Sequence, residues 1–211
     1  MKYFLSFYKI DRLNSILKSG QVQLCIDLTY RCNLKCPYCA AQLGGKGIPN
    51  VKEKTFEEWK EYILSFPVKV KEICFSGGEP TLYEDLPKLA NWLLDTGRGV
   101  VLTTNLWKYQ RIFEIQQSRK FIITASYHKV DDPIRFDKAY RQLAEDYQIK
   151  VREYEHKILP YSDLEVLNDN LDKPVYTNKR FVVSPDAKIY VTCKEYYIER
   201  AKGVNEKGQN K

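Results

Sequence analysis

Cys32-Asn33-Leu34-Lys35-Cys36-Pro37-Tyr38-Cys39 is the stretch that decides what the rest of the chain is built around. Its three thiols are separated by three and then two residues, and a strand-like run at residues 22–28 precedes them. Thiolates are soft ligands that suit zinc, copper(I) or iron–sulfur clusters. Three cysteines on a four-iron cluster would leave one iron open to a substrate or cofactor. The spacing therefore predicts a loop that wraps one metal centre at the end of the first strand.

Two other uses of the cysteines compete with a cluster. A zinc site needs four ligands, and neither His128 nor His156 has the spacing of a zinc finger. Six cysteines, an even number, also allow a disulfide framework. A chain of 211 residues with 29% charged residues and no signal peptide fits a reducing cytosol better. Cluster binding is the favoured hypothesis, and zinc and disulfides stay open as alternatives.

Length and composition limit the class of protein. The 211 residues suit one compact domain, and 44% hydrophobic residues supply a substantial core. No apolar run reaches the length of a membrane span, so we expect a cytoplasmic protein without membrane contact. The net charge of +7 and the pI near 8.9 favour an anionic partner. Because the lysines are scattered among glutamates, as on an ordinary solvated surface, a nucleic-acid partner is not expected.

Strand-like and helical segments alternate along the chain. Thr55 and Glu58 form a capping box before a helical run that ends near Leu64, and later helices are predicted for residues 86–95 and 135–147. Repeated βα units predict a parallel sheet with right-handed crossovers and with sites at the carboxyl ends of its strands. The predicted strands are residues 22–28, 70–75, 100–103, 121–125 and 149–154.

Three of these strands are followed by polar motifs. Ser76-Gly77-Gly78-Glu79-Pro80 follows the second strand, Thr103-Thr104-Asn105 the third and Ser126-Tyr127-His128 the fourth. Glycines let the main chain approach a ligand, and short polar side chains can bind hydroxyl or carboxylate groups. The same residue types are common in turns for backbone reasons. His128 is equally well explained as a substrate contact or as a satisfied polar residue at a rim.

The cysteine loop and the Gly77-Gly78-Glu79-Pro80 motif together resemble the signatures of radical S-adenosylmethionine (radical SAM) enzymes. The resemblance covers residues 22–156. It implies an α/β fold, namely a partial (β/α)6 TIM-type barrel with a short C-terminal β-hairpin extension. It also implies that a [4Fe-4S] cluster is held by Cys32, Cys36 and Cys39. The residues that it assigns to SAM binding are Tyr38, Gly77, Gly78, Glu79, Pro80, Thr104, Asn105, Ser126 and His128.

The resemblance also implies a reaction. In this family an electron from a flavodoxin-like or ferredoxin-like donor passes through the cluster and cleaves SAM. The resulting 5′-deoxyadenosyl radical abstracts a hydrogen atom from the substrate. A peptide or a small metabolite is the favoured substrate class, and a nucleotide or nucleoside is the alternative. A noncatalytic iron–sulfur or zinc protein, used for electron transfer or partner binding, is the competing hypothesis from another class.

The C-terminal region resembles an auxiliary-cluster module in a degenerate form. Residues 180–183 and 188–192 are predicted to form a hairpin around Ser184-Pro185-Asp186-Ala187. SPASM and twitch modules of peptide-modifying radical SAM enzymes begin with a similar hairpin, but with glycine where this chain has Ala187. No cysteine follows Cys193, so a second cluster held by this segment alone is not expected. Cys193 is therefore a buried small hydrophobe, a substrate contact or a catalytic hydrogen-atom donor.

The predicted organisation of the chain has four parts. Residues 1–21 form an N-terminal helical extension, and residues 22–160 form the core barrel. Residues 161–200 are expected to complete the barrel with the hairpin, and residues 201–211 to be a disordered tail. Cys25 and Cys74, inside predicted strands, are expected to be core residues.

Overall fold

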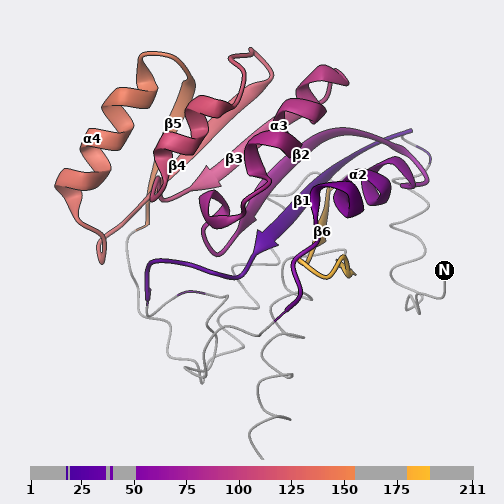
Figure 1. Cartoon of the computed structure of the whole chain (residues 1–211), viewed down its shortest axis with the longest axis horizontal. Coiled ribbons are helices and arrows are strands. Elements are labelled where there is room, and N and C mark those ends of the chain that lie inside the picture. Colours follow the sequence, from indigo (N-terminus) through magenta and orange to yellow (C-terminus); the bar gives the residue numbers. More distant parts are fainter. Residues whose placement is uncertain (1–17, 19, 37–38, 40–50, 155–179, 191–211) are drawn as a thin grey trace, which may run out of the picture.

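The computed structural model describes residues 18, 20–36, 39, 51–154 and 180–190. The strands within these residues form one sheet with the order β5-β4-β3-β2-β1-β6-β7 (Figure 1). Neighbouring strands are parallel except for β6 and β7, which form an antiparallel hairpin. The strands are β1 (Gln21–Thr29), β2 (Lys69–Gly77), β3 (Gly99–Thr104), β4 (Phe121–His128), β5 (Gln148–Tyr154), β6 (Arg180–Val183) and β7 (Ile189–Tyr190).

Helices connect the first five strands. Because β1 to β5 are adjacent in chain order, right-handed crossovers place their connections on one face of the sheet. Figure 1 shows α2, α3 and α4 on the same side of the strands. The predicted capping box is confirmed, since Thr55 and Glu58 each bond to the other's backbone at the start of α2. The connecting helices are α2 (Phe56–Leu64), α3 (Leu86–Asp95) and α4 (Pro133–Ala144), and the 3-10 turns are η2 (Pro80–Leu82) and η3 (Tyr109–Glu114).

The hydrophobic core lies between the helices and one face of the sheet. Along β1, Leu24, Ile26 and Leu28 are fully buried in this core. Trp59 of α2 and Leu89 of α3 pack in the same cluster and are also fully buried. The alternate residues of β1 point to the other face of the sheet, because successive side chains in a strand alternate. On that second face, Asp27 and Thr29 of β1 are buried polar residues, and Cys25 packs against a smaller apolar cluster of Tyr30, Val182 and Tyr190.

The sheet is open, as expected for a partial barrel. Within the described residues β5 pairs only with β4, and β7 pairs only with β6. The predicted hairpin is confirmed by β6 and β7, and it extends the sheet beside β1, with Leu24 opposite Phe181. Ala187 in the hairpin turn has φ of 62°, the left-handed conformation that glycine adopts without strain. The predicted N-terminal helix and C-terminal tail lie outside the described residues.

The largest differences from the predicted boundaries, up to three residues, are in α4 and β4. The helix expected at residues 135–147 is α4, which begins at Pro133 and ends at Ala144. Asp132 caps it by accepting a hydrogen bond from the Ile134 N–H, and proline suits the first helical position. The strand expected at residues 121–125 continues to His128. No helix in the described ranges combines the length and apolar character needed to cross a bilayer.

Candidate functional site

The carboxyl ends of β1 and β2 meet where the chain leads into the cysteine loop. The N–H of Gly78 donates to the Thr29 carbonyl at 2.7 Å, and the N–H of Glu79 donates to the Arg31 carbonyl at 2.8 Å. A Cβ on Gly78 would lie 2.2 Å from the Arg31 oxygen, and one on Gly77 would lie 2.3 Å from the Thr29 oxygen. The backbone after β2 thus approaches the backbone after β1 so closely that only glycine fits at positions 77 and 78. This contact fixes the start of the cysteine loop.

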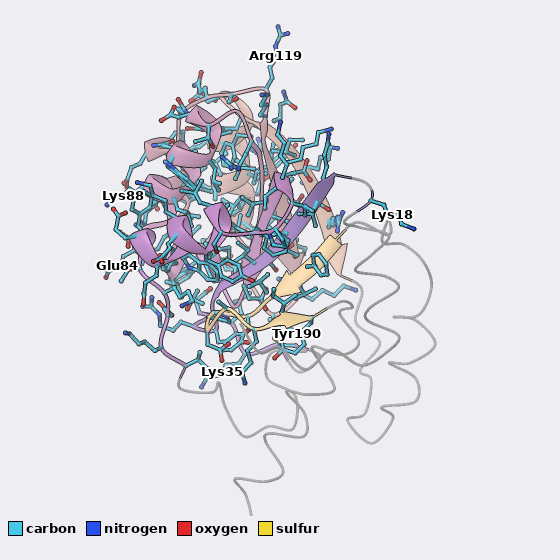
Figure 2. All side chains as sticks on the ribbon, turned by 90° about the vertical axis from the view of Figure 1, so that its right-hand side faces the viewer. Lys18, Lys35, Glu84, Lys88, Arg119 and Tyr190 are labelled. Atoms are coloured by element: carbon cyan, nitrogen blue, oxygen red, sulfur yellow. The ribbon has the colours of Figure 1, made fainter. Side chains whose placement is uncertain are left out.

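The cysteine loop lies at the carboxyl edge of the sheet. Figure 2 shows Lys35, which is in this loop, and Tyr190 toward one end of the molecule, with Arg119 at the other end. Arg119 lies just before β4, at the amino end of that strand. The loop thus occupies the edge where sites of parallel α/β folds are built.

Glu79 joins the turn after β2 to the turn after β3. Its side chain is buried, with only 1% of the residue exposed. Burial raises the pKa of the Glu79 carboxyl, although the hydrogen bonds that it accepts act in the opposite direction. The four donors are the Thr81 N–H (3.0 Å), the Thr81 hydroxyl (2.7 Å), the Thr104 hydroxyl (2.6 Å) and the Asn105 N–H (2.7 Å).

Thr81 is a site residue that sequence reasoning missed. It uses both its backbone N–H and its hydroxyl to bind one oxygen of Glu79. The available signal was local: Glu79 stands directly before η2, where Pro80 occupies the first position and an acidic residue can act as a cap. Glu79 therefore has a structural role in the site, whether or not it also contacts a cofactor.

Asn105 connects the end of β3 to the cysteine loop. Its Nδ2 donates to the Asn33 Oδ1 at 3.0 Å and lies 4.0 Å from the Cys32 Sγ. The N–H of Leu34 donates to the same sulfur at 3.4 Å. Asn33 was not predicted as a site residue, because nothing in its local sequence indicates a contact with a residue 72 positions away.

The three cysteines share one loop and differ in exposure. Cys36 is buried, while Cys32 and Cys39 are half-buried, and the Cys39 N–H donates to the Cys36 carbonyl at 3.0 Å. Burial raises the pKa of the Cys32 thiol to about 11, and the Glu79 carboxylate acts in the same direction. In the described ranges no three His, Cys, Asp or Glu side chains are gathered closely enough to hold a metal ion. The three thiols are nevertheless donors of the kind that hold iron–sulfur clusters, one fewer than the usual four.

Buried polar atoms without partners belong to two of the predicted SAM-binding residues and to Asn33. Within the described part of the chain, the Ser126 Oγ, the Asn105 Oδ1 and the Asn33 Nδ2 have no hydrogen-bond partner. Ser126 and Asn105 are each 4% exposed. Unsatisfied buried polar groups are rare in folded proteins and need an explanation. A polar ligand bound beside the cysteine loop would supply the missing partners, so these residues fit a bound SAM.

The fourth strand places its polar residues differently from the prediction. Ser126 and His128 lie inside β4 rather than after it, because the strand stays paired with β5 through His128 opposite Tyr154. Tyr127, between them, packs against Phe136 of α4 with ring centroids 5.1 Å apart. Ser126 and His128 therefore share the face of the sheet opposite to α4.

The remaining predicted residues divide into three pairs. Pro80 and Thr104 are buried, at the start of η2 and the end of β3 respectively. Tyr38 and Cys193 lie outside the described residues, so their roles stay predictions. Cys25 and Cys74 lie in β1 and β2 in register with each other; Cys74 is buried and Cys25 is half-buried. None of the five cysteines of the described ranges forms a disulfide.

Parts of the chain are similar in sequence to known enzymes. The chain is 45% identical over 82 residues to Fe-coproporphyrin III synthase of Methanosarcina barkeri, across 37% of this chain and 20% of that protein. It is 32% identical over 112 residues to PqqA peptide cyclase of Bradyrhizobium diazoefficiens, across 51% of this chain and 28% of that protein. The chain thus spans less than a third of either relative.

The fold is similar to that of Streptococcus suis SuiB. The structure of SuiB bound to S-adenosylmethionine matches with a TM-score of 0.52 and 13% identity, and covers 92% of this chain and 65% of SuiB. The structure of SuiB bound to the precursor peptide SuiA matches with a TM-score of 0.53 and 17% identity, and covers 96% of this chain and 51% of SuiB. At these identities the similarity establishes the fold alone.

A protein-family comparison extends over most of the sheet. The model described as the Radical SAM superfamily matches residues 26–151, which is more than half of the chain. The match begins in β1 and ends in β5, so it contains the cysteine loop, the glycine pair, Asn105 and Ser126. This chain belongs to the radical SAM superfamily.

Proposed function

We propose that this chain binds a [4Fe-4S] cluster through Cys32, Cys36 and Cys39 and binds SAM beside it. The observation that carries the proposal is a pair of buried, unpartnered polar atoms: the Oδ1 of Asn105, whose amide contacts the cysteine loop, and the Oγ of Ser126, near the carboxyl end of the neighbouring strand β4. A polar cofactor at this place would supply partners for these groups, each of which costs about 1–3 kcal/mol when it is buried and unsatisfied. Membership of the superfamily supports the same cofactors.

The chain's own residues have two tasks in this proposal, to orient SAM and to tune the cluster. Asn105 and Ser126 orient SAM through the Asn105 Oδ1 acceptor and the Ser126 hydroxyl. The Leu34 N–H, hydrogen bonded to the Cys32 sulfur, tunes the electronic environment of the cluster. When bound, the cluster and SAM would supply reductive cleavage to a 5′-deoxyadenosyl radical that abstracts hydrogen from a substrate. Motif similarity alone assigns further contacts with SAM to Tyr38, Gly77, Gly78, Glu79, Pro80, Thr104 and His128.

A peptide is the substrate class that the comparisons support best. PqqA peptide cyclase is among the relatives, and SuiB was solved with a precursor peptide. A small metabolite is the second choice, and a nucleotide the third. Because the chain carries a net charge of +7, an acidic flavodoxin-like or ferredoxin-like protein in the cytoplasm is a suitable electron donor.

The test is anaerobic reconstitution with iron and sulfide, followed by dithionite and SAM. We expect the wild-type protein to produce 5′-deoxyadenosine, detected by liquid chromatography and mass spectrometry. Cys36→Ala should lose both cluster and product, while Cys74→Ala, which changes a thiol in β2, should retain both. A cluster that forms without any 5′-deoxyadenosine would instead indicate a noncatalytic iron–sulfur protein. One tightly bound zinc would contradict the cluster itself.

The substrate and Cys193 need separate measurements. Deuterated peptides, metabolites and nucleosides can be supplied in turn, and the accepted class should transfer deuterium into 5′-deoxyadenosine. We expect transfer from a peptide, and transfer from a nucleoside alone would replace that assignment. If Cys193 is a hydrogen-atom donor, Cys193→Ala should stop product formation while leaving SAM cleavage intact. An unchanged product would remove that role.

A further inference from the structure

The turn directly after Asn105 has an unusual backbone. Leu106 has φ of 63°, in the left-handed region that is unfavourable for residues with a Cβ. Its side chain is fully buried, so the conformation is not a feature of a solvent-exposed loop. Strained residues persist only where the surroundings hold them. The question is what holds this turn, because it determines where the Asn105 amide points.

Arg135 of α4 binds both carbonyl groups of the turn. Its Nη2 donates to the Asn105 carbonyl and its Nη1 to the Leu106 carbonyl, each at 2.8 Å. A guanidinium is planar and presents its donors in a fixed geometry, so two such bonds restrict both position and orientation. The Leu106 N–H is also held, because it donates to the Thr104 hydroxyl at 2.9 Å. The turn is therefore fixed at both of its peptide groups.

Asp131 fixes the position of the Arg135 guanidinium. Its Oδ1 accepts from the Arg135 Nε at 3.1 Å, and its Oδ2 pairs with the Arg135 Nη2. Asp131 is only 8% exposed, and its own N–H donates to the His128 carbonyl at 2.8 Å. The guanidinium also lies over the Trp107 ring, 5.4 Å from its centroid. Arg135 thus connects the end of β4 to the turn after β3 through a partly buried ion pair.

We propose that Arg135, fixed by Asp131, is a positioning residue for Asn105. It acts through the backbone: it keeps the left-handed turn in place, and so directs the Asn105 amide to Asn33 and Cys32. This inference rests on the proposed function, in which Asn105 binds SAM. The competing explanation is that Arg135 only attaches α4 to the sheet. In that case its loss would weaken the fold without a specific effect on Asn105.

Arg141 provides a matched control on the same helix. It pairs with Asp137 at 2.8 Å, with the same four-residue spacing as Arg135 and Asp131. Its side chain is 76% exposed, so Arg141→Gln removes an ion pair of α4 without touching the turn. The test variants are Arg135→Gln and the milder Arg135→Lys, which keeps the charge but cannot bridge two carbonyls in a fixed geometry.

The first measurement is hydrogen–deuterium exchange in the metal-free protein. The Asn105 and Leu106 amides are both hydrogen bonded, to Glu79 and Thr104. Arg135→Gln should speed their exchange by about tenfold, which corresponds to about 1.4 kcal/mol, while amides within β3 stay unchanged. Arg135→Lys should have an intermediate effect and Arg141→Gln none. Equal protection of both amides in all variants would overturn the proposal, and so would a uniform increase across β3.

The second measurement is SAM affinity of the reconstituted protein in a double-mutant cycle. Arg135→Gln should weaken SAM binding by about tenfold in the wild-type background. It should cause no further loss when Asn105 is already alanine, because Arg135 acts through Asn105. Independent, multiplying effects would contradict the proposal. If the wild-type protein binds no SAM, the proposed function fails, and the exchange experiment still decides whether Arg135 positions Asn105.

Discussion

The carboxylate of Glu79 accepts a hydrogen bond from the backbone N–H of Asn105, with 2.7 Å between Oε2 and N. This bond joins the turn after β2, which carries the glycine pair, to the turn after β3, which meets the cysteine loop. Glu79 is therefore a fixed point between two motifs that lie 26 residues apart in the sequence. Its burial means that any change of its hydrogen-bonding capacity should be measurable as a change of stability.

Glu79→Gln should lower the free energy of unfolding of the metal-free protein by about 1–3 kcal/mol. The amide nitrogen of glutamine cannot accept a hydrogen bond, so at least one of the buried donors around residue 79 loses its partner. Urea denaturation measures the effect. Glu57→Gln, at a side chain that is 70% exposed, should change stability by less than about 0.5 kcal/mol. Equal stability of the two variants would contradict the structural role of Glu79.

Gly78→Ala should destabilise the protein and reduce its iron content after reconstitution. The new Cβ would meet backbone atoms of Tyr30 and Arg31, which cannot move without displacing the start of the cysteine loop. Overpacking of this kind costs about 1–3 kcal/mol. Gly99→Ala is the control, because the three atoms nearest to its Cβ all belong to the side chain of Glu72 and none to the backbone. A Gly78→Ala protein with wild-type melting temperature and iron content would show that the close approach is unimportant.

Ser126→Ala should have opposite effects on stability and on SAM binding. Removing a buried hydroxyl without a partner should leave the metal-free protein as stable as wild type, or up to about 1 kcal/mol more stable. In the reconstituted protein the same change removes a hydrogen bond to SAM and should weaken binding about threefold to tenfold. Thermal unfolding and isothermal titration calorimetry provide the two numbers. Unchanged SAM affinity would exclude Ser126 from the site.

The capping box of α2 should give a pH-dependent contribution to stability. A hydrogen bond from the Thr55 N–H is the main cause that lowers the pKa of Glu58 below its ordinary value of 4.5. A lowered pKa in the folded state adds stability above pH 4.5, which is lost as the pH falls through the lowered pKa. The stability difference between wild type and Glu58→Ala should therefore be largest at neutral pH and shrink in acid. A difference that is constant with pH would contradict this.

Most of the regular structure could be predicted because its causes are local. The helix predicted at residues 86–95 is α3 with the same limits, and Thr55 and Glu58 mark the start of α2. The strands were found within one to three residues, because each contains a short run rich in β-branched, aromatic and other apolar residues. The end of β4 was predicted three residues too early, since Tyr127 is held in the strand by packing on Phe136, a contact that the sequence does not display.

The motifs of the candidate site could be predicted from the sequence, but several of the contacts between them could not. Parallel topology correctly brought Glu79 and Asn105 to one edge of the sheet, where they are hydrogen bonded. The partners Asn33 and Arg135 were missed, because each contact joins segments that are distant in the sequence. The pairing of β6 with β1 could not be predicted from the sequence either, because strand order at a sheet edge depends on tertiary packing.

The most direct test of the account is the electron paramagnetic resonance spectrum of the reduced, reconstituted protein with and without SAM. If three cysteines leave one iron open and Asn105 and Ser126 bind SAM beside it, adding SAM should change the spectrum. Ser126→Ala should then require a higher SAM concentration for the same change. A spectrum that SAM does not alter, in a protein with a full complement of cluster, would contradict the central claim.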